Sequence, residues 1–263
     1  MTDLDFLSYA DVHRVVVETI PAIRRLSISA VSFVPRGGGV IAGIIAQLLD
    51  LPLIEAAELA QMPPGRCLLV DDMIVTGRSL AAFRRRFLPD YRAVPTYVFA
   101  AVPSERLPGA EVDLVSITVD PARYFLLPWE IGDIFRPIFP FPTLVDLDGV
   151  IRAPGDPARA LLTTPHVIAH LVCFGGTEAA AVQWLAEHGY RYQRLTCLAD
   201  PEDSEGLAEI IQENAVRLYL TGDARRGRAV RARCPSCHVI AFPEMIELDA
   251  VGHRIDTSSP GPG

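Results

Sequence analysis

The chain has 263 residues and half of them are hydrophobic, which is enough for two modest α/β domains or one large one. Its formal net charge of -8 argues against duplex DNA and against a bare anionic membrane as partners. The apolar runs fall short of a membrane span and the acidic N-terminus shows no signal-peptide pattern, so we expect a cytoplasmic protein. All 24 basic residues are arginine, and five scattered cysteines predict reduced thiols instead of a disulfide framework.

Apolar segments of strand length alternate with amphipathic segments of helix length, which predicts βαβ units and parallel sheets. In the first half the predicted strands are residues 28–34, 66–70, 94–102 and 111–119, and the predicted helices are residues 39–50 and 77–87. In the second half the predicted strands are residues 143–149, 166–174, 192–198, 216–223 and 238–242, and the predicted helices are residues 177–189, 203–214 and 225–233.

A proline-rich stretch at residues 136–143 separates the two alternating series. We therefore predict an α/β fold with a first domain over residues 1–141 and a second over residues 142–250. The tail, residues 251–263, is rich in Ser, Pro and Gly and is predicted to be disordered.

The stretch "LLVDDMIVTGRSL", residues 68–80, places Asp71 and Asp72 directly after a strand that is predicted to end at Val70. Two adjacent carboxylates are costly at the end of a buried strand, so a diol, a metal ion or a phosphate ester is expected there. The following turn offers backbone N–H groups at a helix start, which is an anion site. The alternative is an ordinary capped helix with two solvated aspartates.

The same stretch resembles the phosphoribosyl pyrophosphate (PRPP) motif of type I phosphoribosyltransferases. Three further segments resemble that family in the same order, with bacterial xanthine–guanine phosphoribosyltransferases as the nearest subfamily. They are "VSFVPRGGGVIAGIIA", similar to the pyrophosphate loop, "YVFAAVP", similar to the next core strand, and "YFLLPWEIGDIFRP", similar to the hood over the base. The resemblance covers residues 6–138 and implies a type I phosphoribosyltransferase fold.

This resemblance also implies a role for each matching residue. Asp71 and Asp72 would be the catalytic pair that holds the ribose diol. The pyrophosphate, bridged by Mg²⁺, would be bound by Arg36, Gly37 and Gly38. The 5'-phosphate would be bound by Val75, Thr76, Gly77, Arg78 and Ser79. Trp129 would stack on the base, with Glu130 and the Ile131 backbone near its edge.

The chain departs from the family pattern at three places. Val75 stands where purine members carry a third acid, and Ala101 and Val102 stand where they carry a lysine that reads the base. The segment "EAAELAQMPP" is short for the flexible loop that closes over PRPP. These departures keep a second interpretation open, in which the domain binds PRPP or a nucleotide without catalysis.

A second acid pair, Asp146 and Asp148, occurs in "TLVDLDGVIR". Acids two apart at a strand end point the same way and can share Mg²⁺. The stretch resembles the first motif of haloacid dehalogenase (HAD)-like hydrolases, and "LYLTGDA" resembles their fourth. This implies a HAD-like fold over residues 142–245, with Asp146 as nucleophile and Asp148 as acid/base. The resemblance further implies that a Mg²⁺ site comprises Asp146, Asp148 and Asp223. The family's phosphate-clamping lysine is absent, and Arg225 and Arg226 are the nearby candidates for its charge.

Together these motifs predict a phosphoribosyltransferase that joins a nucleobase-like acceptor to ribose 5-phosphate from PRPP, releasing pyrophosphate, with a linked phosphatase acting on the nucleotide. The cofactor would be Mg²⁺, and the assembly a homo-oligomer or a complex with other pathway enzymes. The alternatives are a non-catalytic PRPP or nucleotide sensor, and a subunit completed by a partner, each with a HAD-like domain that has lost its activity.

Overall fold

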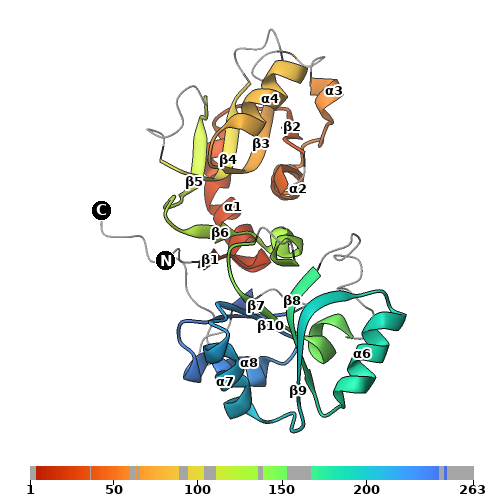
Figure 1. The fold of residues 1–263 in the computed structure, drawn as a ribbon. Helices are drawn as coiled ribbons and strands as arrows, with labels where there is room; N and C mark the ends of the chain where they lie inside the picture. Colours follow the sequence, from red (N-terminus) through yellow and green to blue (C-terminus); the bar gives the residue numbers. More distant parts are fainter. Residues whose placement is uncertain are drawn as a thin grey trace. The chain divides into compact units, whose positions relative to one another are not determined.

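A computed structural model of the chain describes residues 4–35, 37–59, 63, 66–88, 94–103, 111–135, 139–152, 167–242 and 246–247. The chain divides into two compact units, and each is an α/β unit with parallel strands, as predicted (Figure 1). Unit 1 comprises residues 1–5 and 10–125, and unit 2 comprises residues 6–9 and 126–263. The tail predicted to be disordered, residues 251–263, lies outside the described residues.

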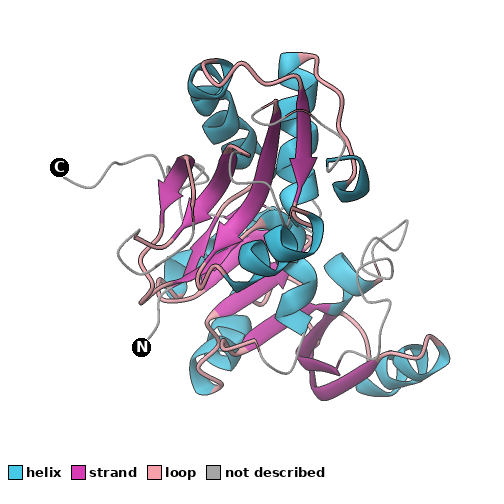
Figure 2. Cartoon of the chain, turned by 90° about the horizontal axis from the view of Figure 1, so that it is seen from above, coloured by secondary structure: helices cyan, strands magenta, loops and turns pink. Residues whose placement is uncertain are grey.

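Unit 1 is built around a sheet whose described strands follow the order β2-β3-β4-β5, all parallel. Helices flank these strands, as the cartoon in Figure 2 shows. The elements are β1 (Leu4–Phe6), α1 (Tyr9–Arg24), β2 (Ala30–Phe33), α2 (Gly37–Leu49), α3 (Ala56–Leu59), β3 (Cys67–Ile74), α4 (Arg78–Phe87), β4 (Thr96–Ala101), β5 (Leu114–Thr118) and β6 (Tyr124–Leu126). β1 and β6 form a separate two-stranded sheet where the units meet in sequence.

The sequence reasoning missed helix α1. Its buried residues Val12, Val16, Ile20 and Ile23 recur every three or four positions, which is the spacing of one face of a helix. This signal was present in the sequence. Pro21 lies inside the helix and interrupts the pattern that periodicity alone would give.

Unit 2 contains a sheet with the order β12-β11-β10-β7-β8-β9 among its described strands. All neighbours are parallel except the β11–β12 pair. The elements are η2 (Pro128–Phe135), β7 (Thr143–Asp146), η3 (Leu147–Ile151), β8 (Val167–Phe174), α6 (Glu178–Glu187), β9 (Arg191–Leu198), α7 (Ser204–Glu213), β10 (Leu218–Thr221), α8 (Ala224–Arg233), β11 (His238–Ala241) and β12 (Ile246–Glu247). The strand order places β7 beside β10, so the carboxyl ends of these two strands are neighbours.

The core of unit 2 lies between its sheet and the neighbouring helices α7 and α8 (Figure 1). Leu144, Val172 and Tyr219 come from three adjacent strands, and they pack with Leu207 of α7 and Val230 of α8. Alternation along each strand directs every second side chain to this face. Asp146 and Thr221 are two positions after Leu144 and Tyr219, so they extend the same face to the carboxyl end of the sheet.

The division between the units falls at Leu126, whereas the sequence places the domain boundary at residues 141/142. The segment in between contains η2, which packs against β8 and therefore belongs with unit 2. The backbone N–H of Leu7 also donates to the carbonyl of Leu126 over 3.2 Å, which holds residues 6–9 in the same unit.

The prediction that the cysteines are reduced thiols is wrong for two of the five. Cys173 and Cys197 are direct partners in the β8–β9 register and form a disulfide with a Cα–Cα distance of 4.7 Å. They are 24 residues apart in sequence, so their pairing depends on the strand order of the folded unit. Cys67, Cys234 and Cys237 are free and buried.

None of the described helices has the length and apolar character needed to cross a lipid bilayer.

Candidate functional site

The acid pair of unit 1 lies within a strand, contrary to the expectation that the strand ends at Val70. β3 continues to Ile74, and Asp71 pairs in register with Val98 of β4. On its other side the pairing with β2 stops where Phe33 meets Val70. Beyond Val70, β3 is therefore paired with β4 and has left β2, which opens the edge of the strand that carries the acids.

The start of helix α2 lies against this open edge. A Cβ added to Gly38 would lie 2.8 Å from the carbonyl oxygen of Val70 and 3.3 Å from the Cα of Asp71, so only glycine fits. The segment predicted to bind pyrophosphate and the predicted diol-binding acids are therefore neighbours. Arg36, which precedes this helix, lies outside the described residues.

Asp71 is buried, with 4% of its surface exposed. The pKa of Asp71 is raised from its ordinary value of 3.8 to about 8, first by burial and next by the charge of Asp72, whereas the hydrogen bond from the Asp72 backbone N–H acts to lower it. That N–H donates to Asp71 Oδ1 over 3.1 Å. The raised pKa means that burial and the neighbouring charge of Asp72 both disfavour the ionised form of Asp71.

The turn after the acids leads into α4. Gly77 is the N-cap of α4 and has a φ of 69°. No side-chain hydrogen bond caps the N–H groups at this start of α4. Thr76, Arg78 and Ser79 are exposed, and Val75 has 53% of its surface exposed. An exposed helix start with uncapped N–H groups has the geometry of an anion site.

The acids of unit 2 lie at the carboxyl ends of two adjacent strands. Asp146 ends β7 and is fully buried, and Asp223 follows β10 and caps α8 by accepting from the N–H groups of Arg225 and Arg226. Asp146 caps the short π-helical turn η3, because its Oδ1 accepts from the N–H groups of Asp148 and Gly149 at 3.0 and 2.9 Å.

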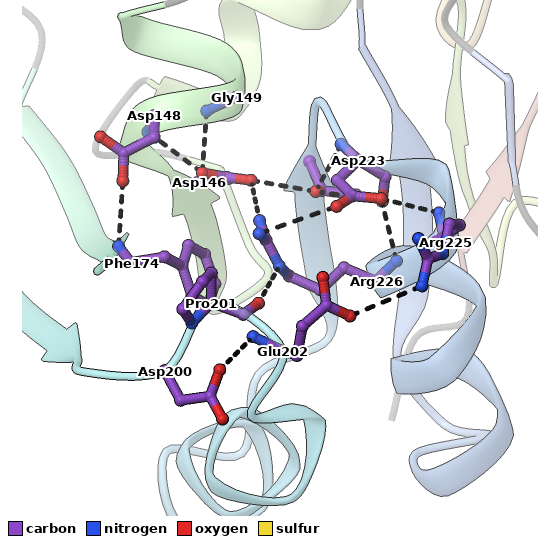
Figure 3. Close-up of polar contacts among 11 residues, drawn as sticks. Asp146, Asp148, Gly149, Phe174, Asp200, Pro201, Glu202, Asp223, Arg225 and Arg226 are labelled. Atoms are coloured by element: carbon purple, nitrogen blue, oxygen red, sulfur yellow. Dashed lines mark hydrogen bonds and ion pairs between the residues drawn. The ribbon is translucent and has the colours of Figure 1, made fainter.

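The guanidinium of Arg226 lies between these two carboxylates (Figure 3). Its Nη1 donates to Asp146 Oδ2 over 2.8 Å, and its Nη2 lies 3.7 Å from Asp223 Oδ2. Thr221 Oγ1 also donates to Asp146 Oδ2, over 3.1 Å. Burial raises the pKa of Asp146, whereas the Gly149 N–H, Arg226 and Thr221 act to lower it.

Asp148, the third predicted metal ligand, has other partners. Its Oδ1 accepts from Arg152 Nη1 over 2.9 Å, and its Oδ2 accepts from the backbone N–H of Phe174 over 2.9 Å. The structure therefore does not gather Asp146, Asp148 and Asp223 around one point. Among the described residues, no group of three or more His, Cys, Asp or Glu side chains is arranged to hold a metal ion.

Two glycines allow the two acid-bearing turns to meet. A Cβ added to Gly149 would lie 2.7 Å from Asp146 Oδ2 and 2.8 Å from the Gly222 backbone nitrogen. A Cβ on Gly222 would in turn collide with the Gly149 carbonyl. These distances are shorter than any ordinary non-bonded contact, so glycine is required at both positions for the turns to touch.

The predicted base-binding segment belongs to unit 2, whereas the acid pair belongs to unit 1. Within unit 2, Trp129 lies beside Tyr9 with ring centroids 6.4 Å apart, and Glu130 Oε2 accepts from the Leu127 N–H over 3.0 Å. Ile131 contributes backbone to η2.

Sequence reasoning missed four contacts that shape unit 2. They are the pairing of Arg226 with Asp146, the hydrogen bond from Thr221 to the same carboxylate, and the hold of Phe174 and Arg152 on Asp148. The sequence did name Arg225 and Arg226 as candidates for a missing charge. The structure selects Arg226, since the side chain of Arg225 is 81% exposed and lies 3.7 Å from Glu202.

No family model and no curated protein matches the chain. Among solved structures, 49% of the chain is similar to a purine phosphoribosyltransferase from Pyrococcus horikoshii Ot3, with 18% identity, a TM-score of 0.41 and 95% of that chain covered. The same share is similar to a hypothetical protein from Neisseria gonorrhoeae with bound ppGpp, with 18% identity, a TM-score of 0.42 and 90% of that chain covered. A Helicobacter pylori xanthine-guanine-hypoxanthine phosphoribosyltransferase gives 15% identity, a TM-score of 0.39 and 94% coverage of that chain, again over 49% of this one. These similarities are remote, and no residue role follows from them.

Proposed function

We propose that unit 1 is a phosphoribosyltransferase that joins a nucleobase-like acceptor to ribose 5-phosphate from PRPP. The observation that carries the proposal is the contact of Gly38 with the backbone of Val70 and Asp71. It brings together the loop that resembles a pyrophosphate site and the acid pair that resembles a diol site. The uncapped start of α4 follows only a few residues later and supplies a third anion-binding element.

Each part of PRPP then has a partner of matching chemistry. The two ribose hydroxyls donate to the carboxyl oxygens of Asp71 and Asp72. The 5'-phosphate accepts from backbone N–H groups of the turn at residues 75–79 and from the hydroxyls of Thr76 and Ser79. The pyrophosphate lies at the start of α2, next to Gly37 and Gly38.

In the reaction, the bond from C1 of ribose to the pyrophosphate oxygen breaks and a bond from C1 to the acceptor nitrogen forms. The electron pair of the broken bond leaves with pyrophosphate, and the acceptor loses its proton. The developing positive charge at C1 favours the ionised form of a nearby carboxyl group. The pKa of Asp71 places this group close to ionisation near neutral pH.

Mg²⁺ fits this site as an ion carried in with the pyrophosphate, because the hard oxygens of Asp71 and Asp72 are the donor type that it prefers. When bound, it would neutralise charge on the leaving group.

The test is isothermal titration with PRPP and Mg²⁺, together with an assay of pyrophosphate release over a panel of bases. We expect binding and base-dependent release by the full chain. In the Asp71→Asn/Asp72→Asn variant we expect kcat/KM to fall at least about 100-fold. Asp120→Asn is the control, because Asp120 is an exposed unit-1 acid that only caps a local turn through the Ala122 N–H.

Absence of any PRPP binding would contradict the proposal. Binding without release by any base would reject the transferase and support a PRPP or nucleotide sensor, or a subunit that a partner completes. Equal loss in Asp120→Asn would show that the effect of the double variant is not specific to the acid pair.

For unit 2 the resemblance to HAD-like hydrolases implies a Mg²⁺-dependent phosphatase. The residues present do not fit that ion, because Arg226 lies between the two carboxylates that would share it and Asp148 is held by Arg152 and Phe174. We therefore derive no phosphatase step from this arrangement.

A further inference from the structure

The acid cluster of unit 2 is arranged around a cation that the chain itself supplies. We propose that the Arg226 guanidinium is an internal counterion that occupies the place of a divalent cation between Asp146 and Asp223. It follows that unit 2 binds no divalent metal at this cluster while Arg226 is present. It also follows that removing Arg226 exposes a cation site formed by Asp146 and Asp223.

The first support is the position of the guanidinium. One of its nitrogens lies 2.8 Å from Asp146 Oδ2 and the other 3.7 Å from Asp223 Oδ2. Only 14% of the Arg226 side chain is exposed, and Asp146 is fully buried. A charge pair with this burial is screened little by solvent, so the attraction is strong enough to hold the guanidinium in place.

The second support is that two further groups hold the guanidinium, namely the ring of Phe174 and the carbonyl of Pro201 (Figure 3). Its Cζ lies 3.6 Å from the centroid of the Phe174 ring, which is a cation–π contact. Its Nε donates to the carbonyl of Pro201 over 3.3 Å. A planar guanidinium stacked on a ring and fixed at three nitrogens has little freedom to move aside for a metal ion.

The third support is that Asp146 has used both of its oxygens. Oδ1 accepts from the N–H groups of Asp148 and Gly149, and Oδ2 accepts from Thr221 and Arg226. A carboxylate with two donors on each oxygen has no lone pair left to direct at a metal. Loss of Arg226 frees one acceptor position on Oδ2, on the side that faces Asp223.

The fourth support comes from local electrostatics. Arg226 lies in the first turn of α8, and a cation at this end of a helix is opposed by the helix dipole. The carboxylates of Asp146 and Asp223 must therefore supply the attraction. Without Arg226 no cation of the described chain lies between these two acids, and a divalent ion would supply the missing positive charge.

The experiment compares Mn²⁺ binding by four full-length proteins, followed by electron paramagnetic resonance, with thermal unfolding in Mg²⁺ as a second readout. The proteins are the wild type, Arg226→Ala, Arg226→Ala/Asp223→Asn and Arg225→Ala. Arg225→Ala is the matched control, because it removes the same charge from the neighbouring position, where the side chain is exposed. Any Mn²⁺ bound elsewhere in the chain is common to all four proteins and cancels in the comparison.

We expect Arg226→Ala to bind one more Mn²⁺ than the wild type, at least about tenfold more tightly than the double variant does. Mg²⁺ should raise the Tm of Arg226→Ala and leave the Tm of the wild type and of Arg225→Ala nearly unchanged. Failure of a folded Arg226→Ala protein to gain Mn²⁺ binding would overturn the proposal. So would a gain that persists in the double variant.

If Arg226→Ala does not fold in the absence of metal, the test becomes refolding in Mg²⁺ against KCl of equal ionic strength. Recovery in Mg²⁺ alone supports the proposal, and equal failure in both salts overturns it. A fifth protein, Asp223→Asn, gives an independent test, because Mn²⁺ binding by the wild type that this variant abolishes would show that Arg226 does not exclude metal. None of these outcomes depends on PRPP binding by unit 1, so the two proposals fail separately.

Discussion

Two acid clusters of this protein have a similar sequence pattern but different charged neighbours. Asp71 and Asp72 of unit 1 lie side by side, and burial with mutual repulsion raises the pKa of Asp71 to about 8. Asp146 of unit 2 is equally buried, but it is paired with Arg226 and accepts four hydrogen bonds. An apolar strand that runs into aspartates therefore predicts a polar cluster and does not say whether a ligand or the protein neutralises it.

The difference has a structural origin. In unit 1 the strand pairing with β2 stops before the acids, the start of α2 contacts the edge that this leaves open, and the uncapped start of α4 follows a few residues later. In unit 2 the turns after β7 and β10 touch through glycine, which places Arg226 of α8 within reach of Asp146. Under the proposed function the first cluster receives an anionic ligand with hydroxyl groups, whereas in the second cluster Arg226 of the chain itself pairs with Asp146.

The Asp146 cluster of unit 2 depends most strongly on the contact between the turns that contain Gly149 and Gly222. Gly149→Ala places a methyl group 2.7 Å from Asp146 Oδ2, and we expect unit 2 to lose roughly 3 kcal/mol of stability. Gly176→Ala is the control in the same unit, because a Cβ there meets nothing within 4 Å. Urea unfolding, followed by the fluorescence of Trp184 in unit 2, measures the free energy of unfolding of both variants. Equal stability of the two variants would show that the turns do not need to touch.

The disulfide supports the same cluster from the neighbouring strand. Cys173 precedes Phe174, whose N–H holds Asp148 and whose ring lies over Arg226. Reduction removes a cross-link that closes a loop of about 24 residues, and we expect a loss of about 2 kcal/mol in unit 2. Urea unfolding with and without dithiothreitol measures it, and Cys173→Ala/Cys197→Ala should show no further effect of the reductant. An unchanged midpoint on reduction would contradict this expectation.

We expect PRPP binding at the Asp71/Asp72 cluster of unit 1 to depend on the close contact between α2 and β3. Gly38→Ala forces this helix away from Val70 and Asp71, so PRPP should bind about tenfold more weakly, which corresponds to about 1.4 kcal/mol. Gly43→Ala is the control in the same helix, because a Cβ there meets nothing within 4 Å and alanine favours the helix. Titration calorimetry on both variants checks the prediction. If the two bind PRPP equally, the contact of α2 with β3 does not shape the site.

The last expected effect is a pH dependence that belongs to unit 1. The folded pKa of Asp71, about 8, is above its ordinary value of 3.8, so the folded state binds more protons between these pH values. Stability from this group is therefore complete below about pH 4 and is lost as the pH rises through about 8. Asp71→Asn should remove this decline. Urea unfolding followed by circular dichroism from pH 4 to 9 measures it, and parallel curves for both proteins would contradict the assignment.

Much of the secondary structure could be predicted because its signals are local. Alternation and helical periodicity predicted β3 with helix α4 after it, and the structure confirms both elements. The strand predicted over residues 143–149 is too long, because β7 ends at Asp146 and Asp148 lies in the turn η3, which the sequence reasoning missed. The end of β3 was predicted too early, because Asp71 and Asp72 are poor strand formers that tertiary pairing with β4 retains in the sheet. Helix α1 was missed although its buried positions follow a helical period.

The sequence by itself determined which residues are acidic, which segments are strands and helices, and that each acid pair comes near the carboxyl end of a strand. These properties depend on neighbours within a few positions along the chain. Only the tertiary structure decided the partners of the acids. Arg226 is 80 positions from Asp146, Gly38 reaches Asp71 from another element, and Cys173 meets Cys197 only through strand order. Charge pairing and close packing depend on distance in space, and the fold alone sets that distance.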